Sequence, residues 1–235
     1  MDENSIKPND EISHSHNELS LKHPFIFVVS GPTGSGKTSH ILKFLSKINL
    51  FSSPRITNII YVYSEDQNIF KSFECNVPIK YTKDFKKMLD YTPKKNERPL
   101  LIYDDVQREL SNSPELLDLI TKKSHHRGIS VIIQLQNLFF PGKNFHELRH
   151  NAHYIGLTKS RFNLQKIKIF ASQLFGGGEK VKDFINAYED CMKENYSLFF
   201  IDLHPDTTLN FMYRANPFSD VNQYWYFTEE QKKAI

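Results

Sequence analysis

Short apolar runs alternate with amphipathic segments along most of the chain. Runs of strand length, rich in β-branched and aromatic residues, lie at 25–29, 58–63, 79–82, 99–103, 129–135 and 153–158. Apolar residues recur at helical spacing in segments 37–47, 163–174 and 179–194. A further helix is predicted from Pro114 to residue 122, with Ser113 as its N-cap. Buried strands that alternate with helices predict an α/β fold in which helices flank a mainly parallel central sheet.

The two ends of the chain depart from this alternation. Apolar segments at 196–203 and 209–214 flank the turn-forming sequence HPDTT, which predicts a C-terminal β-hairpin that adds an antiparallel edge to the sheet. Residues 1–22 lack apolar periodicity, so we expect a disordered acidic tail there. One folded domain then spans residues 23–216. The aromatic extension at 217–235 is expected to pack on the core or on an adjacent subunit through its YWYF stretch.

Charge is unevenly distributed along the 235 residues. The net charge is +3, and the first 22 residues carry five acids and two lysines, which leaves a net +6 on the remainder. A mildly basic body is compatible with a polyanionic partner. Cys75 and Cys191 form neither a metal-binding spacing nor a disulfide framework, so a reducing, intracellular setting is expected. No apolar run reaches roughly 18 residues, so we expect no membrane partner.

The sequence VVSGPTGSGKTSHILKFL places a glycine-rich loop between a predicted strand and a predicted helix. Residues 31–38 fit G-x-x-x-x-G-K-[ST], the pattern of a loop whose amide groups cradle phosphates at a helix N-terminus. Lys37 is expected to reach the β- and γ-phosphates of a nucleoside triphosphate, and Thr38 to ligate Mg²⁺. The predicted nucleotide-binding residues are Gly31, Pro32, Thr33, Gly34, Ser35, Gly36, Lys37, Thr38 and Ser39.

Polar residues follow two of the other predicted strands. The apolar run LLIY ends in Asp104 and Asp105, and SVIIQL is followed by Gln136. Because ligands bind at the carboxyl ends of strands in such sheets, we expect all three beside the glycine-rich loop. Asp104 would hold the Mg²⁺ shell, Asp105 would orient or deprotonate the attacking water, and Gln136 would sense the γ-phosphate. The alternative at both places is a strand that simply ends in polar residues.

In combination, SGPTGSGKTS, LLIYDDV and SHHRGISVIIQLQNLF resemble the FtsK/HerA superfamily of DNA-pumping ATPases. Within it they are most similar to the genome-packaging ATPases of poxvirus-like viruses, virophages and Maverick/Polinton elements. The segments QNLFFPGKNFHELRHNAHYIGLTKS and YSLFFIDLHPDTTLNFMYRANPF extend the resemblance over residues 24–216.

The resemblance implies an ASCE-type P-loop core, in which another strand lies between the Walker A and Walker B strands. It implies ATP and Mg²⁺ as ligands and a ring of identical subunits with ATP sites at their interfaces. Double-stranded DNA would move through the centre, and a capsid protein would be a partner. It also implies a location inside an infected or host cell, or association with the virion.

The family pattern assigns a role to each conspicuous polar residue. Lys37 and Thr38 occupy the Walker A positions, Asp104 the Walker B metal position, Asp105 the catalytic acid and Gln136 the sensor glutamine. Two positions depart from the pattern: Leu135 stands where many relatives have Thr, and His125 stands where cellular pumps have Arg. The identity of a trans arginine finger is therefore open among three residues, Arg127, Lys159 and Arg161, of which Arg161 is nearest in register to a basic pair in viral relatives.

A DNA pump is expected to grip phosphates with Lys and Arg side chains on loops, without reading bases. Lys143, in the FFPGKNF loop after the sensor, is the first candidate contact. Arg127, Lys122 and Lys123 are the others. For each of the four, an ordinary exposed charge is the alternative.

The rival function is a small-molecule or nucleotide kinase, since the size and the P-loop fit one. Kinases usually clamp phosphates with several arginines in a lid, whereas the corresponding region here offers only Arg149 and Arg161, well separated. A GTPase is disfavoured because no N-K-x-D sequence is present. A degenerate binding module is disfavoured by the intact lysine, threonine and paired acids.

Overall fold

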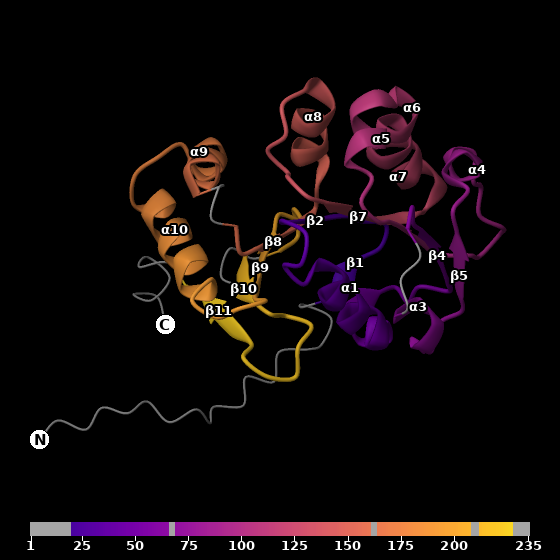
Figure 1. The fold of residues 1–235 in the computed structure, drawn as a ribbon, viewed down its shortest axis with the longest axis horizontal. Coiled ribbons are helices and arrows are strands. Elements are labelled where there is room, and N and C mark those ends of the chain that lie inside the picture. Colours follow the sequence, from indigo (N-terminus) through magenta and orange to yellow (C-terminus); the bar gives the residue numbers. More distant parts are fainter. Residues whose placement is uncertain (1–19, 66–68, 161–163, 208–211, 228–235) are drawn as a thin grey trace, which may run out of the picture.

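A mostly parallel sheet runs through the molecule (Figure 1). The computed structural model describes residues 20–65, 69–160, 164–207 and 212–227. In these residues nine strands form the main sheet, in the order β11-β10-β9-β8-β2-β7-β6-β4-β5. Its mutually parallel strands are β2 (Ile26–Ser30), β4 (Asn58–Val62), β5 (Ile79–Thr82), β6 (Pro99–Tyr103), β7 (Ser130–Leu135) and β8 (Tyr154–Thr158). The antiparallel strands are β9 (Leu198–Asp202), β10 (Tyr213–Ala215) and β11 (Tyr224–Tyr226).

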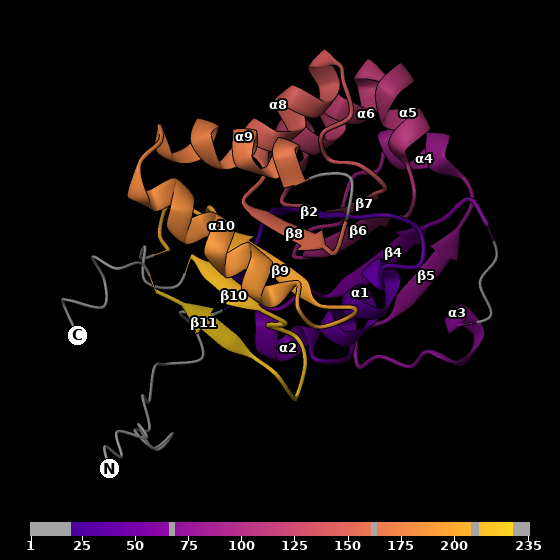
Figure 2. The ribbon, with the colours of Figure 1, turned by 60° about the vertical axis from the view of Figure 1, so that its left-hand side comes forward.

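Helices cover both faces of this sheet (Figures 1 and 2). One face carries α4 (Phe85–Leu89), α5 (Gln107–Asn112), α6 (Pro114–Asp118), the π-helical turn η1 (Leu119–Lys123), α7 (Ser124–Arg127), α8 (Lys143–Asn151), α9 (Leu164–Phe175) and α10 (Glu179–Cys191). The other face carries α1 (Lys37–Ser46), α2 (Ile48–Phe51) and α3 (Ile69–Ser72). Alternation along β2 supplies both cores, since Ile26 and Val28 face the first group while Phe27 and Val29 face the second.

The sheet order confirms the expected α/β class and the expected position of an additional strand. β7 lies between β2, which precedes the glycine-rich loop, and β6, which precedes Asp104. Strands predicted at 79–82 and 99–103 have the predicted limits. The predicted cap is also present, because the Ser113 hydroxyl accepts a hydrogen bond from the Leu116 amide at 3.1 Å.

Four helices on the first face were not predicted, α4, α5, α7 and α8. The FFPGKNF sequence was expected to be a loop, but Lys143 is the first residue of α8. Phe145 and Leu148, three residues apart, form the buried stripe of this helix, while the rest of its surface is polar. Such a short stripe is a weak helical signal beside a Pro-Gly turn.

The described fold extends beyond both predicted domain boundaries, and after residue 216 it does so by packing on the core, as expected for the aromatic extension. Leu21 is buried and forms β1 (Leu21–Lys22), which pairs in parallel with β3 (Ser52–Ser53), so these residues belong to the fold and not to the tail. Residues 1–19 lie outside the described part of the chain. After residue 216, Phe218 is buried with its ring centroid 5.0 Å from that of Phe44, and β11 forms the sheet edge beside β10. The hairpin of β9 and β10 is thus one strand in from the edge.

No helix in the described ranges has both the length and the apolar character needed to cross a membrane.

Candidate nucleotide-binding site

The glycine-rich loop connects β2 to α1 at the carboxyl end of the central strand. Gly36 is the N-cap of α1 with φ of +93°, a conformation that a side chain would strain. At Gly31 a Cβ atom would lie 1.7 Å from Oγ1 of Thr158 on the neighbouring strand β8, so only glycine fits. The Thr158 hydroxyl in turn donates to the Ser35 hydroxyl at 2.6 Å. Strand β8 therefore supports the outer side of the loop.

Lys37 lies folded back over this loop. Its Nζ donates to the carbonyl oxygens of Gly31 at 2.8 Å and Pro32 at 3.0 Å. Burial lowers the pKa of Lys37, and the nearby carboxylates of Asp105 and Asp104 oppose that shift. The ammonium group is thus held at the mouth of the loop, where it can bind phosphate oxygens.

A cavity of about 480 Å³ brings together the four predicted catalytic residues that the structure describes, Lys37, Asp104, Asp105 and Gln136. Its lining residues are Thr33, Gly34, Gly36, Lys37, Thr38, Ser39, Asp104, Asp105, Gln136 and Tyr196. They come from the carboxyl ends of three adjacent strands, β2, β6 and β7, together with one residue just before β9. Open α/β sheets bind their ligands at these carboxyl ends. An adjoining hollow of about 470 Å³ is lined by Pro32, Thr33, Gly34, Ser35, Lys159, Ser160, Asn195 and Tyr196.

The two acids after β6 have different surroundings. Asp104 is buried, and its Oδ2 accepts a hydrogen bond from the Tyr61 hydroxyl at 3.2 Å. That hydroxyl accepts in turn from Nε2 of Gln134 at 2.9 Å. Asp105 is exposed with φ of +54°, and both its carboxylate oxygens lie 3.1 Å from Nε2 of Gln136. Asp104 is therefore fixed from within the sheet, whereas Asp105 faces the open cavity.

Tyr61 and Gln134 were missed by the sequence analysis. Tyr61 lies on β4 and resembles any other aromatic residue of a buried strand. Gln134 offered a signal, because it is the one amide within the apolar run SVIIQL and is fully buried. A buried amide must find hydrogen-bond partners, but the sequence does not say which strand supplies them.

The segment that follows Gln136 is tied to several elements. The Asn137 amide donates to Oε1 of Gln107 on α5 at 2.8 Å. The Leu138 amide donates to the Ser30 hydroxyl at 2.8 Å, and the Leu138 carbonyl accepts from Nη1 of Arg149 on α8 at 2.8 Å. A shift of Gln136 would therefore reach both α5 and α8.

The three candidates for an arginine finger lie in different places. Arg161 is outside the described residues. Lys159 lines the adjoining hollow, with Nζ 3.5 Å from Oδ1 of Asn195. Arg127 lies at the end of the sheet opposite the cavity, shortly before the amino end of β7, and its Nη1 donates to the Tyr91 carbonyl at 2.8 Å.

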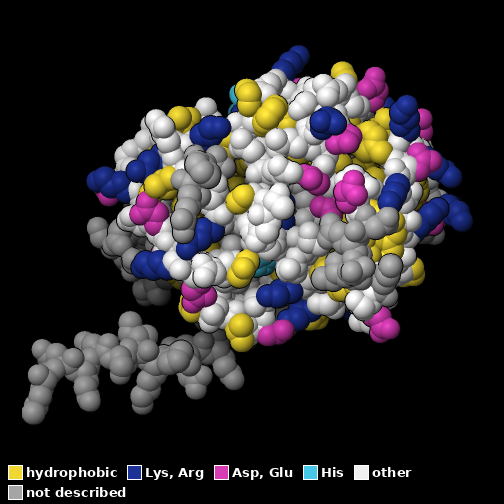
Figure 3. All heavy atoms as spheres, viewed as in Figure 1, with side chains coloured by type: hydrophobic (Ala, Val, Ile, Leu, Met, Phe, Trp, Pro, Cys, Tyr) yellow, Lys and Arg dark blue, Asp and Glu magenta, His cyan; other side chains and the backbone are white. Residues whose placement is uncertain are grey.

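The four candidate DNA contacts do not form one patch either. Lys122 and Lys123 pair with Asp118 at 3.1 and 3.4 Å, shortly before the amino end of β7. Arg127, in the same region, donates to a backbone carbonyl. Lys143 is exposed at the first residue of α8, which follows the carboxyl end of β7 and so lies on the side of the cavity. On the face drawn in Figure 3, Lys and Arg side chains are interspersed with Asp and Glu.

A hollow of about 300 Å³ lies at the amino ends of β2, β7 and β8, opposite the nucleotide-binding cavity. His125, His150 and His153 are among its lining residues. Burial lowers the pKa of His153 to about 4, so its ring is neutral near pH 7. In the described part of the chain no three His, Cys, Asp or Glu side chains are grouped so that they could hold a metal ion.

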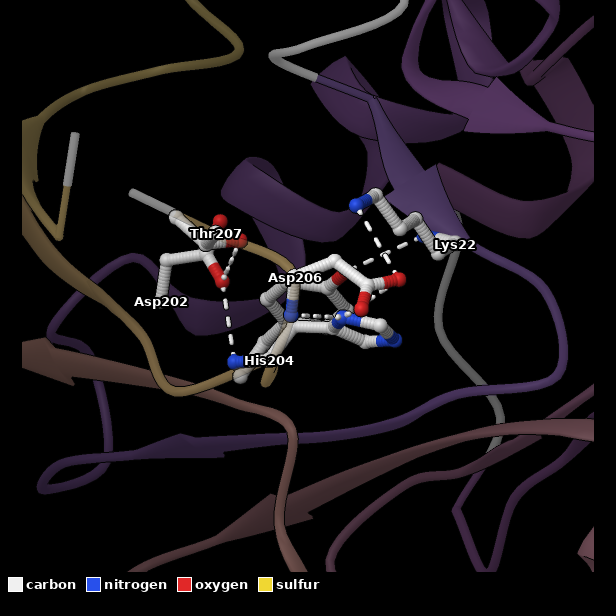
Figure 4. Close-up of polar contacts among 6 residues, drawn as sticks. Lys22, Asp202, His204, Asp206 and Thr207 are labelled. Carbon is white, nitrogen blue, oxygen red and sulfur yellow. Dashed lines mark hydrogen bonds and ion pairs between the residues drawn. The ribbon is translucent and has the colours of Figure 1, made fainter. Parts of the chain in front are cut away.

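Residues 202–207 form a polar cluster (Figure 4), and Leu203 and Pro205 in this segment line the hollow. Asp202 is buried and pairs with the equally buried Arg214 at 2.6 Å. The Asp202 carboxylate also accepts hydrogen bonds from the Thr207 hydroxyl at 2.9 Å and the His204 amide at 3.1 Å. Asp206 pairs with Lys22 of β1 at 3.4 Å. These contacts join the hairpin to the first strand and lie away from the nucleotide-binding cavity.

Solved structures similar to this one include two viral packaging enzymes. The DNA-packaging ATPase B204 from Sulfolobus turreted icosahedral virus is 16% identical, with a TM-score of 0.55 over 88% of this chain and 99% of its own. The genome-packaging NTPase B204 from Sulfolobus turreted icosahedral virus 2, in complex with AMPPCP, is also 16% identical, with a TM-score of 0.53 over 87% and 98%. At such identity these matches establish a shared P-loop ATPase fold. No curated protein matches the sequence.

A family model matches most of the chain. The model describes the poxvirus A32 protein and covers residues 11–201, which include the glycine-rich loop, the two acids and Gln136. This match confirms the resemblance to the packaging ATPases of poxvirus-like viruses that the motifs indicate. The chain belongs to the poxvirus A32 protein family.

Proposed function

We propose that this chain hydrolyses ATP in order to drive double-stranded DNA into a viral capsid. One observation carries the proposal: the lysine and threonine of the loop, both acids and the sensor glutamine line a single cavity. Membership of the A32 family supports it, as do solved relatives described as packaging enzymes in complex with ATP-γS and AMPPCP.

Nucleotide binding would use the loop and the end of β6. The loop amides and Lys37 are suited to the β- and γ-phosphates. The hydroxyl of Thr38 and the carboxylate of Asp104 are hard oxygen donors that line the same cavity, and Mg²⁺ prefers one or two such protein ligands together with phosphate oxygens. When bound, Mg²⁺ neutralises charge on those phosphate oxygens.

Hydrolysis would use Asp105 and Gln136. The Asp105 carboxylate would accept a proton from a water molecule whose oxygen bonds to the γ-phosphorus. The bond between that phosphorus and the β–γ bridging oxygen breaks, and ADP and phosphate leave. The Gln136 amide, which donates to Asp105 at 3.1 Å, would hold the carboxylate and the water in line.

Force on DNA would pass through the segment after Gln136. Leu138 is bound to Arg149 of α8, and α8 begins at Lys143. We propose that Lys143 contacts DNA phosphates without reading bases, and that Arg127, Lys122 and Lys123 are the further candidates for such contacts. A ring of this chain would place Arg161, or else Lys159 or Arg127, at a neighbour's γ-phosphate. A capsid protein and an intracellular site of action complete the proposal, in line with the free thiols of Cys75 and Cys191.

The test is ATP hydrolysis by the purified chain with and without long double-stranded DNA. Hydrolysis should rise with DNA, and Lys37→Ala and Asp105→Asn should each lower kcat by about 100-fold or more. Lys43→Ala removes an exposed lysine from the same helix and should leave kcat unchanged. DNA stimulation should weaken as salt rises, because phosphate contacts release counterions. Transfer of phosphate to a small acceptor, indifferent to DNA, would instead identify a kinase.

A further inference from the structure

The cavity of the phosphate-binding loop continues into the adjoining hollow. Both are lined by Thr33, Gly34 and Tyr196, so these residues stand at their junction. The first cavity has the cationic and carboxylate groups that suit a triphosphate and its metal ion. The second, of about 470 Å³, has Lys159 as the one charged residue among the described residues that line it, and is otherwise lined by uncharged groups, among them Ser160 and Asn195. The nucleoside that is joined to a triphosphate needs such a space.

Tyr196, at the junction, has an unusual backbone conformation. Its φ is +58°, in the left-handed region. Within the described ranges the other non-glycine residues with positive φ are Asn96, Asp105, Asn216 and Asn222, which belong to the residue types that tolerate it. A bulky aromatic residue in this region is strained, and such strain is concentrated at functional sites.

The strain is imposed by contacts on both sides of the residue. Nε2 of His40, one turn into the helix that follows the loop, donates to the Tyr196 carbonyl at 2.7 Å. His40 is itself buried, and burial lowers the pKa of His40, which favours the neutral ring with a single N–H to donate. Two residues later, the Leu198 amide donates to Oδ1 of Asn216 at 2.8 Å. The backbone of Tyr196 is therefore fixed between α1 and the β9–β10 hairpin.

The side chain of Tyr196, in contrast, remains uncovered. It is 68% exposed, although its Cβ and Cδ1 lie 3.6 Å from the position that a Cβ on Gly36 would take. An exposed ring on a rigid, strained backbone beside a phosphate-binding loop has no packing role that would explain its cost. It is placed to offer a flat apolar surface to a ligand in the cavity.

We propose that Tyr196 is the platform on which the base of the bound nucleotide stacks, with the adjoining hollow as the nucleoside subsite. The inference rests on the proposed function for the identity of the ligand. Stacking on an aromatic ring tolerates every base, because each has a π-face. The subsite therefore distinguishes a nucleoside triphosphate from a bare polyphosphate more strongly than it distinguishes one base from another.

Equilibrium binding of a non-hydrolysable ATP analogue, and its displacement by inorganic tripolyphosphate, tests the platform. Tyr196→Ala should weaken binding of the ATP analogue at least about fivefold and leave tripolyphosphate binding unchanged. Tyr196→Phe keeps the ring and should bind the analogue like the wild type. Tyr224→Ala removes another exposed ring, which lines neither of these two cavities, and should change neither affinity.

A second variant separates binding from folding. Tyr196→Gly removes the ring and also relieves the strained φ, so its melting temperature should not fall while its affinity for the ATP analogue does. Equal weakening of the analogue and of tripolyphosphate would overturn the platform, because Tyr196 would then act by shaping the loop. Unchanged binding of the ATP analogue by Tyr196→Ala would also overturn the platform. If DNA-stimulated hydrolysis fell in that variant while binding stayed the same, Tyr196 would instead be a contact between subunits.

The proposed function can fail separately. If the analogue binds and Tyr196→Ala weakens it, but the wild-type chain gives no DNA-stimulated hydrolysis, the platform stands and the packaging motor does not. If the wild-type chain hydrolyses ATP with DNA stimulation while Tyr196→Ala binds normally, the reverse holds. A wild-type chain that binds neither the analogue nor tripolyphosphate would overturn both.

Discussion

The hydroxyl of Tyr61 lies 3.2 Å from Oδ2 of Asp104, the buried acid at the end of the neighbouring strand. Tyr61 is itself fully buried, and burial together with the Asp104 charge raises its pKa, so the phenol stays protonated and donates a hydrogen bond to the carboxylate. Gln134 donates to the same hydroxyl from β7. Strands β4 and β7, on either side of β6, thus orient a carboxylate that is proposed to hold Mg²⁺.

Removal of the Tyr61 hydroxyl should weaken the binding of Mg²⁺ that supports ATP hydrolysis. Tyr61→Phe should raise the Mg²⁺ concentration needed for half-maximal ATP hydrolysis by about 10-fold or more, as loss of outer-shell partners does at other metal sites. It should also lower the free energy of unfolding by about 1–3 kcal/mol, because the Gln134 amide loses its acceptor in a buried position. Mg²⁺ titration of the hydrolysis rate, together with urea denaturation, measures both effects.

Tyr103→Phe is the matched control for this prediction. Tyr103 is also fully buried, and its hydroxyl finds no hydrogen-bond partner among the described residues. Its loss should therefore leave Mg²⁺ dependence unchanged and stability unchanged or slightly higher. If both variants required the same additional Mg²⁺, orientation of Asp104 by Tyr61 would be refuted.

A charge placed beside Asp105 should change the pH dependence of hydrolysis. Gln136→Glu brings a second carboxylate to the position from which the amide now donates at 3.1 Å. Like charges disfavour ionisation, so the pKa of the pair should rise, and the base should be lost to protonation at a higher pH. The acidic limb of the kcat profile should shift upward in pH.

Gln136→Met is the uncharged comparison. It removes the amide and should lower kcat, but it adds no charge and should leave the acidic limb in place. The same upward shift in both variants would indicate that the limb does not report Asp105.

Much of the fold could be predicted because its signals are local. The apolar runs of β5 and β6 and the cap of Ser113 are contained in a few consecutive residues. Helix α8 was not predicted because its buried stripe has only two residues and follows a Pro-Gly turn. The three aromatic residues of β11 were expected to pack, but they form a strand only because β10 lies beside them.

Some residues of the candidate site could likewise be predicted from local sequence signals, and others could not. Lys37, Asp105 and Gln136 each follow or open an element that the sequence marks, so their meeting in one cavity could be foreseen from the sheet type alone. Tyr61 and Tyr196 could not, since the role of the first depends on which strands neighbour β4, and that of the second on a backbone angle set by His40.

The buried ion pair of Asp202 and Arg214 should matter for folding far more than the exposed pair beside it. Arg214→Met would leave the Asp202 carboxylate buried without its cation, at a cost of about 3–5 kcal/mol in the free energy of unfolding. Lys22→Met breaks the exposed pair with Asp206 and should cost less than about 1 kcal/mol. Urea denaturation near pH 7 measures both.

The cost of Arg214→Met should also depend on pH. Burial already raises the pKa of Asp202, and Arg214 holds it down, so loss of the cation raises the folded-state pKa further above its unfolded value. A raised carboxyl pKa penalises the folded state above that pKa, and the penalty disappears as the group protonates. The difference between wild type and variant should therefore shrink as pH falls from 7 to the onset of acid unfolding. A constant difference would mean that the folded-state pKa of Asp202 is the same in the variant as in the wild type, as expected if the carboxylate lies open to water.

The close approach of Gly31 to Thr158 predicts that one second substitution restores ATP binding to Gly31→Ala and that another does not. A methyl group at residue 31 would meet Oγ1 of Thr158 at 1.7 Å, so Gly31→Ala should displace the loop, at a cost typical of overpacking of about 1–3 kcal/mol, and weaken ATP binding. In Gly31→Ala/Thr158→Ala the nearest clashing atom is gone, and affinity should recover in part. Gly31→Ala/Thr158→Ser keeps that hydroxyl and should not recover. Equal affinity in the two double variants would show that β8 does not set the position of the loop.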